Sequence, residues 1–190
     1  MKSKIYQLTT NNIAVGKKTI LLLLLAFTFG CDNNDDKATS NNPIDQLPPV
    51  TQVGANKVGC LIDGEVFLPD SRPNSTNCFY QLVDGEYYFA LALSKRDSFN
   101  NLIALNLGTN SKQIAQGEQY QLLEYISGNA SAAYIFNLTE SFTNNINTGN
   151  LTITRLTDQF VSGTFWFDVE DSNGVVHRVR EGRFDMQYTQ

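Results

Sequence analysis

The side chains in this chain that could take part in chemistry are few. His177 is the only histidine, and it lies between Val176 and Arg178 in a segment of alternating apolar and polar residues. The sequence contains no Gly-x-Ser-x-Gly, no glycine-rich phosphate loop and no His-Glu-x-x-His. Its acids are scattered over turns, so no pair of carboxylates suited to glycoside hydrolysis stands out. A strand histidine satisfied by neighbours or solvent is favoured over a catalytic base, and no catalytic residue or enzymatic activity is predicted.

One group of oxygen-bearing side chains deserves a test as a metal site, namely Asp168, Glu170, Asp171 and Asn173. Their spacing departs from the known calcium-loop pattern. A hairpin turn over Asp171–Gly174 explains them better, because Asn and Gly adopt positive φ at little cost. No histidine or second cysteine pair near the cysteines suggests zinc. The sequence predicts no metal and no cofactor.

Cys60 and Cys78 allow two interpretations. A disulfide between them would stabilise the fold by roughly 3 kcal/mol in the chain-entropy model. If the predicted strands 58–68 and 77–84 form a simple hairpin, however, Phe67 faces about Cys78 and Cys60 lies well beyond it. The alternative is two buried free thiols, which are common in protein cores.

Three aromatic side chains are candidates for stacking against a ligand. Trp166 lies on the opposite strand face from Phe165 and Phe167, where a polar residue is expected. An exposed indole can stack on a sugar ring or a protein partner; the alternative is that a loop or the other layer covers it. Tyr88 and Tyr125 pose the same question more weakly.

The first 31 residues have the pattern of an export signal. Lys17 and Lys18 precede an apolar run over residues 20–29, which is too short to cross a bilayer because about 20 apolar residues are required. The run ends in Thr28-Phe29-Gly30-Cys31, which resembles the lipobox of bacterial lipoproteins. We therefore expect residues 1–30 to be removed and Cys31 to carry the lipid that anchors the chain to a membrane.

The mature chain is expected to be acidic and tethered. Removing the four lysines that precede Cys31 leaves ten of the fourteen basic side chains against nineteen acidic ones, a net charge of −9. Nucleic acid is an unfavourable partner for such a chain. Residues 31–56 are polar and proline-containing, which predicts a flexible linker. The acidic stretch Asp32–Asp36 is similar to the signal that sends Bacteroidetes lipoproteins to the cell surface; ordinary linker composition is the alternative.

Residues 57–190 have the alternation of a single β-domain. Apolar residues recur at every second position and turn-forming residues interrupt them every few residues, while helical periodicity is absent. An antiparallel two-layer sandwich of about eight or nine strands is expected, with a flattened barrel as the alternative. A bulge at Glu181-Gly182 would return Phe184, Met186 and Tyr188 to the core. The predicted strands cover 58–68, 77–84, 86–96, 101–108, 118–125, 131–139, 150–157, 159–169 and 174–188.

Motifs at both ends of this domain carry a family resemblance. The segment Gly59-Cys60-Leu61-Ile62-Asp63-Gly64-Glu65-Val66-Phe67-Leu68-Pro69 is similar to the opening strand of uncharacterised lipoproteins of Bacteroidetes. The segments Ser162-Gly163-Thr164-Phe165 and Glu181-Gly182-Arg183-Phe184-Asp185 are similar to their closing strands. The resemblance spans about residues 48–188; it implies an exported lipoprotein, without an activity or catalytic residues.

The sequence leaves three classes of function. The first is a non-catalytic envelope lipoprotein of the outer membrane that binds or scaffolds something outside the cell, in its sharper form a carbohydrate-binding module using Trp166, Tyr88 and Tyr125. The second is a structural partner of an outer-membrane protein complex, which would show an apolar patch or an unpaired sheet edge. The third, an enzyme, is the least favoured.

Overall fold

The computed structural model describes residues 41–190. The expected signal peptide, Cys31 and the first part of the linker lie outside the described residues. Within residues 41–190 the one helical element is a short 3₁₀ turn, η2 (Pro43–Gln46), which Asn42 caps by accepting the Ile44 N–H. No helix in this range has the length and apolar character needed to span a membrane.

Eleven strands follow in the described part of the chain. They are β1 (Lys57–Ile62), β2 (Glu65–Phe67), β3 (Thr76–Val83), β4 (Glu86–Arg96), β5 (Leu102–Thr109), β6 (Gln119–Leu122), β7 (Ala130–Phe136), β8 (Thr139–Phe142), β9 (Gly149–Leu156), β10 (Phe160–Glu170) and β11 (Val176–Gln187). The domain is therefore all-β, as the alternation of apolar residues predicts.

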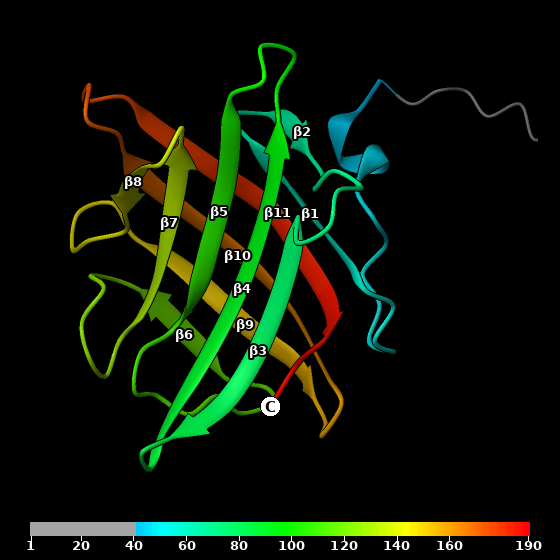
Figure 1. Ribbon diagram of the computed structural model, residues 1–190, viewed down its shortest axis with the longest axis vertical. Helices are drawn as coiled ribbons and strands as arrows, with labels where there is room; N and C mark the ends of the chain where they lie inside the picture. Colours follow the sequence, from blue (N-terminus) through cyan, green and yellow to red (C-terminus); the bar gives the residue numbers. More distant parts are fainter. Residues whose placement is uncertain (1–40) are drawn as a thin grey trace, which may run out of the picture. The chain divides into compact units, whose positions relative to one another are not determined.

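All these strands belong to one sheet rather than to two. The hydrogen-bonded order is β2-β1-β11-β10-β9-β6-β7-β5-β4-β3, and β8 pairs with β7 off this path. Every pairing is antiparallel except that between β6 and β7. The sheet curls into a half-barrel, so that β3, β4, β5 and β7 cross in front of β1, β11, β10 and β9 (Figure 1). The structure thus has the barrel-like architecture, in which one sheet supplies both layers of the core.

The core lies between the two arms of the curled sheet. Alternate residues of β4 and β5 (Phe89, Leu91, Leu93, Leu105 and Leu107) are buried against alternate residues of β9, β10 and β11 (Leu151, Ile153, Phe165, Phe167 and Phe184). Phe89 and Phe184 join the two arms with ring centroids 6.1 Å apart. Each such side chain contributes about 1.5–3 kcal/mol through burial, which drives the sheet to fold back on itself.

The C-terminal residues close the curl at one end. After β11, the Thr189 carbonyl accepts the Tyr80 N–H at 3.0 Å, and the Thr189 N–H donates to the Cys78 carbonyl at 3.1 Å. These bonds bring β3, the last strand of the order, against the chain that follows β11. The edge of β3 is therefore partly paired, which reduces its capacity to bind another strand.

Two unpredicted turns raise the number of strands from nine to eleven. The predicted strand 58–68 is broken at Asp63 and Gly64, which have φ of 53° and 88°. The predicted strand 131–139 is broken at Asn137 and Leu138, with φ of 47° and 73°. Two residues of positive φ form the tight turn that joins antiparallel strands. In a continuous strand Phe136 and Leu138 would share the buried face of Tyr134, but the turn leaves them 42% and 83% exposed.

A buried carboxylate attaches the N-terminal segment to the sheet. Asp185 of β11 is only 2% exposed, and its oxygens accept five hydrogen bonds. The donors are the hydroxyls of Thr51 (2.6 Å) and Ser162 (2.7 Å) and the N–H groups of Val53 (3.0 Å), Gly54 (2.8 Å) and Ala55 (3.1 Å). Burial acts to raise the pKa of Asp185, but these hydrogen bonds outweigh it and hold the pKa well below its usual value.

Replacing this carboxylate is expected to be costly. In Asp185→Asn the side-chain NH₂ group faces at least one of the N–H donors that the carboxylate had accepted, and that donor is left without a partner. We therefore expect the free energy of unfolding to fall by about 3 kcal/mol, measured by urea unfolding. The matched control Asp84→Asn, at an exposed turn with φ of 51°, is expected to change little. Because the folded pKa of Asp185 is depressed, its contribution is full above the unfolded pKa and is lost as pH falls through the folded pKa. A loss of stability in acid that is the same in wild type and in Asp185→Asn would contradict this assignment.

Leu138 is expected to destabilise the folded domain at its position in the β7–β8 turn. A left-handed backbone conformation costs a non-glycine residue about 1–2 kcal/mol, and its side chain is almost fully exposed. We expect Leu138→Gly to raise the free energy of unfolding by about 1 kcal/mol, measured by urea unfolding. Asn137→Ala, which removes the side chain from the same turn, is expected to lower it.

Candidate functional site

Trp166 lies on the outer face of the sheet within a four-strand polar surface. In the strand register, Gln119 of β6 faces Thr152 of β9, and Thr152 faces Thr164 of β10, which in turn faces Arg183 of β11. The next row places Asn150 of β9 opposite Trp166. The indole is 43% exposed, so the second arm of the sheet does not cover it. We call this outer face of β6, β9, β10 and β11 the Trp166 surface.

A β-bulge brings a guanidinium onto the indole. Phe165 pairs with Gly182 and Phe167 pairs with Val179, so the single residue Trp166 faces two residues of β11, Arg180 and Glu181. Glu181 has φ of 55°, and a Cβ at Gly182 would lie 2.5 Å from the Phe165 ring. The predicted bulge at Glu181-Gly182 is therefore present. Its effect is to aim Arg180 outward, with its Cζ 5.3 Å from the centre of the Trp166 ring.

The charges of this surface are balanced internally. The Arg180 guanidinium lies 2.7 Å from the Asp168 carboxylate and donates to the carbonyls of Phe167 and Val179. The Arg183 guanidinium lies 3.3 Å from the Glu181 carboxylate. Each arginine has an acidic partner, so a ligand need not bring a charge of its own. A neutral polar ligand is favoured over an anion.

The surface is hollowed, with a cavity volume of about 620 Å³. It is lined by the indole, by the paired charges of Arg180, Arg183 and Glu181, by Val50 of the N-terminal segment, and by the neutral polar side chains Gln119, Asn150, Thr152 and Thr164. Within residues 41–190, the Gln119 amide and the Thr164 hydroxyl make no hydrogen bond to another residue. An aromatic platform beside several neutral donors and acceptors suits a sugar ring, which has apolar C–H faces and a rim of hydroxyls.

The structure places Tyr88 and Tyr125 in a different groove, on the outer face of the other arm. Two register rows cross β3, β4, β5 and β7 there, one with Phe79, Ala90, Gly108 and Ser131 and the other with Asn77, Ala92, Asn106 and Ala133, which Phe142 of β8 extends. The small residues form the floor of a groove of about 370 Å³. The three predicted aromatic residues are therefore divided between two surfaces.

The walls of this second groove are aromatic. The Tyr88 hydroxyl lies 3.0 Å from the Ser111 hydroxyl oxygen, which fixes the ring on one side. On the other side Tyr125, which is 63% exposed, stacks on Phe142 with ring centroids 5.7 Å apart. The sequence signal for this groove was the alternation of alanine with core residues in β4, which becomes informative only once the strand order is known.

The two described cysteines are free and buried. Cys60 lies on β1 and pairs with Phe67 of β2, whereas Cys78 lies on β3 and pairs with Leu91 of β4. The hairpin that would have brought their strands together does not form, because 58–68 turns back on itself. Of the two interpretations, the structure has the buried thiols and not the disulfide. Lipidation of Cys31 stays a prediction, since that residue lies outside the described range.

His177 is held by side chains from three other segments. Its Nδ1 lies 2.8 Å from the Asp63 carboxylate and its Nε2 lies 3.6 Å from that of Asp171. Its ring stacks on Tyr134 with centroids 4.4 Å apart. Asp171 also accepts the N–H groups of Asn173 and Val175, as a tight turn requires. No group of three or more His, Cys, Asp or Glu side chains in residues 41–190 is arranged to hold a metal ion.

Comparison of the chain with protein-family models, with curated proteins and with solved structures found no match. The resemblance to Bacteroidetes lipoproteins accordingly stays a prediction, and the surfaces described above carry the functional argument.

The two thiols are expected to be unreactive in the folded protein. Burial raises the pKa of both Cys60 and Cys78 to about 12, so almost no thiolate is present near neutral pH. We expect iodoacetamide to leave both unmodified in the native protein and to alkylate both in urea without a reducing agent, as detected by mass spectrometry. Failure to alkylate the unfolded, unreduced chain would show a disulfide instead.

Proposed function

We propose that this chain is a lipid-anchored protein of the bacterial outer membrane whose β-domain binds a neutral glycan, without catalysis, on the Trp166 surface. The observation that carries the proposal is the half-exposed indole, fixed by Arg180 on a bulge and bordered by neutral amides and hydroxyls. Stacking supplies affinity that depends on ring geometry, while the polar neighbours select the hydroxyl pattern.

Two features support binding rather than turnover. Asp168 and Glu181, the acids beside the indole on β10 and β11, are each paired with an arginine, whereas glycoside hydrolysis requires two carboxyl groups that act on either side of the scissile bond. The surface also stands on four strands of a continuous sheet. A rigid scaffold of this kind preorganises a binding site and offers little movement for a closing lid.

The expected lipid at Cys31 supports the location at the envelope. An acidic mature chain carrying several acyl chains remains at the membrane and presents its domain to the surrounding medium. The acidic residues after Cys31 favour the cell surface, where a glycan ligand is accessible.

A second candidate function is docking to an envelope protein through the groove between Tyr88 and Tyr125. Its stacked pair Tyr125 and Phe142 is exposed, and the groove is lined mainly by apolar atoms. Aromatic residues are enriched at protein interfaces, so this candidate becomes preferred if glycan binding fails.

The proposal is tested by the emission of the one tryptophan in the chain. Purified full-length protein in detergent is titrated with a panel of neutral oligosaccharides of glucose, mannose and N-acetylglucosamine. We expect at least one to change the fluorescence of Trp166 and to raise the melting temperature. In Trp166→Ala, binding measured by calorimetry is expected to weaken about tenfold or more, which corresponds to about 1.4 kcal/mol or more.

The matched control is Tyr88→Ala, which removes an aromatic ring from the second groove and is expected to leave glycan affinity unchanged. Unaltered Trp166 emission across the whole panel would refute the glycan proposal. A ligand whose affinity falls in Tyr88→Ala but persists in Trp166→Ala would transfer the binding site to the second groove.

A further inference from the structure

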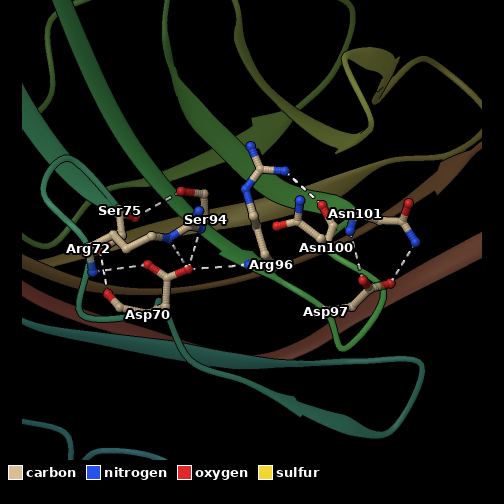
Figure 2. A network of polar contacts seen from close by, with 8 residues as sticks. All are labelled: Asp70, Arg72, Ser75, Ser94, Arg96, Asp97, Asn100 and Asn101. Atoms are coloured by element: carbon tan, nitrogen blue, oxygen red, sulfur yellow. Dashed lines mark hydrogen bonds and ion pairs between the residues drawn. The ribbon is translucent and has the colours of Figure 1, made fainter.

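The loop between β4 and β5 is built around the carboxylate of Asp97. Its Oδ1 accepts the N–H groups of Phe99 at 2.9 Å and Asn101 at 2.8 Å, and its Oδ2 accepts the Asn101 amide at 2.9 Å. The hydrogen bond from the Asn101 side chain is the main reason that the pKa of Asp97 lies below its usual value. Figure 2 shows this carboxylate pointing at Asn101. The loop is therefore preorganised and its acid is used internally.

The same loop is tied to two neighbouring segments. The Arg96 guanidinium donates to the Asn100 carbonyl at 2.7 Å, and the Arg96 N–H donates to Asp70 in the loop after β2 (Figure 2). On the other side, Asn137 of the β7–β8 turn donates to the Asn101 side chain at 2.9 Å and accepts the Leu102 N–H at 2.9 Å. Two hairpin tips thus form one hydrogen-bonded unit at this end of the domain.

This unit presents apolar side chains to solvent. Phe99 is 84% exposed and Leu138 is 83% exposed, so neither supports the core. Leu138 moreover occupies a left-handed position, φ 73°, that glycine or asparagine would fill without strain. The loop is rigid and displays a phenylalanine, and the neighbouring turn retains a strained and exposed leucine. Together these two features indicate a contact with an apolar partner. We call Phe99 and Leu138 the rim.

The length of chain between Cys31 and the domain indicates that the apolar partner is the bilayer. Nine residues lie between Cys31 and the described range, so even a fully extended chain from Cys31 to residue 41 spans at most about 36 Å. The described chain begins next to η2, which contacts β2 and lies toward the same end of the domain as the β4–β5 loop (Figure 1). A lipid on Cys31 therefore keeps the bilayer within reach of the rim at all times.

The form of the rim also favours a bilayer over a protein. A stable protein interface buries about 800 Å² on each partner, whereas the residues around Phe99 in its loop are polar: Ser98, Asn100 and Asn101. Two protruding apolar tips are enough for a bilayer contact when a tether already makes the contact intramolecular. The charged groups of the unit itself make polar contacts within it: Asp70 pairs with Arg72, the Asp97 carboxylate accepts the Asn101 N–H, and the Arg96 guanidinium donates to the Asn100 carbonyl.

We propose that the rim, Phe99 with Leu138, inserts into the outer surface of the bilayer that carries the lipid anchor and so fixes the orientation of the domain. This inference rests on the proposed anchoring through Cys31. The occupant is the acyl region of the membrane, and the loop hydrogen bonds position the two side chains for it.

The test places an environment-sensitive nitrobenzoxadiazole dye on the rim. Lipidated full-chain protein carrying Phe99→Cys is labelled, which is selective because Cys60 and Cys78 are buried and the lipid expected on Cys31 blocks its sulfur as a thioether. The protein is reconstituted into vesicles of phosphatidylethanolamine and phosphatidylglycerol. We expect the dye emission to shift to the blue and to be quenched by phospholipids that carry a doxyl group on the acyl chain.

The matched control is Leu82→Cys with the same dye. Leu82 is an exposed apolar residue beside the β3–β4 hairpin, at the opposite end of β4 from the β4–β5 loop, and its dye is expected to stay in water. Leu138→Cys supplies a second rim position that is expected to behave like position 99.

Flotation of the vesicles separates the two proposals. Protein that floats while the rim dyes stay as aqueous as the control dye overturns rim insertion and leaves the anchor intact. Protein that does not float overturns the anchor and the rim with it. A rim dye that responds only when an outer-membrane extract is added overturns the bilayer as occupant and favours a protein partner.

Discussion

The fold of residues 41–190 depends on one buried charge, the carboxylate of Asp185. A charged group removed from water is tolerated only when hydrogen bonds replace its hydration, and here five donors do so. Three of them are consecutive backbone N–H groups, from Val53 to Ala55, which have no strand partner of their own. The carboxylate thus satisfies the backbone of a segment that could not otherwise lie against the sheet. It also fixes where the linker joins the domain.

This attachment has consequences along both neighbouring strands. Asp185 lies just beyond the bulge at Glu181 and Gly182, and Ser162, which donates to it, belongs to β10. The same two strands carry Trp166 and Arg180, and Val50 at the border of the Trp166 surface immediately precedes the attached segment. The buried side chain of Asp185 therefore helps to set the geometry of the proposed binding surface. A site of this kind can be precise without being on a loop.

The sequence predicted what is local and missed what depends on strand order. Alternation placed β4 and β10 correctly to within one residue at each end, because one buried face fixes a period of two. The bulge was also predictable, since the apolar phase slips at Glu181. Asp63-Gly64 and Asn137-Leu138 were missed because apolar residues lie on both sides of them, and in the structure the positive φ of all four residues reveals the two turns. The separation of Trp166 from Tyr88 and Tyr125 could not be predicted, because it follows from the order of strands in the sheet.

The two proposed contacts constrain each other through the direction of β10. This strand runs toward the end of the domain that carries the rim, and Trp166 is four residues before its last residue, Glu170. At about 3.3 Å per residue the indole lies roughly 13 Å along the strand from that end. If the rim touches the bilayer, the Trp166 surface lies on the side of the domain. It is then open to the aqueous phase and close to the membrane. Such an orientation favours glycans that are themselves attached to the envelope over polymers that must approach from far outside, since the former are present at that height already.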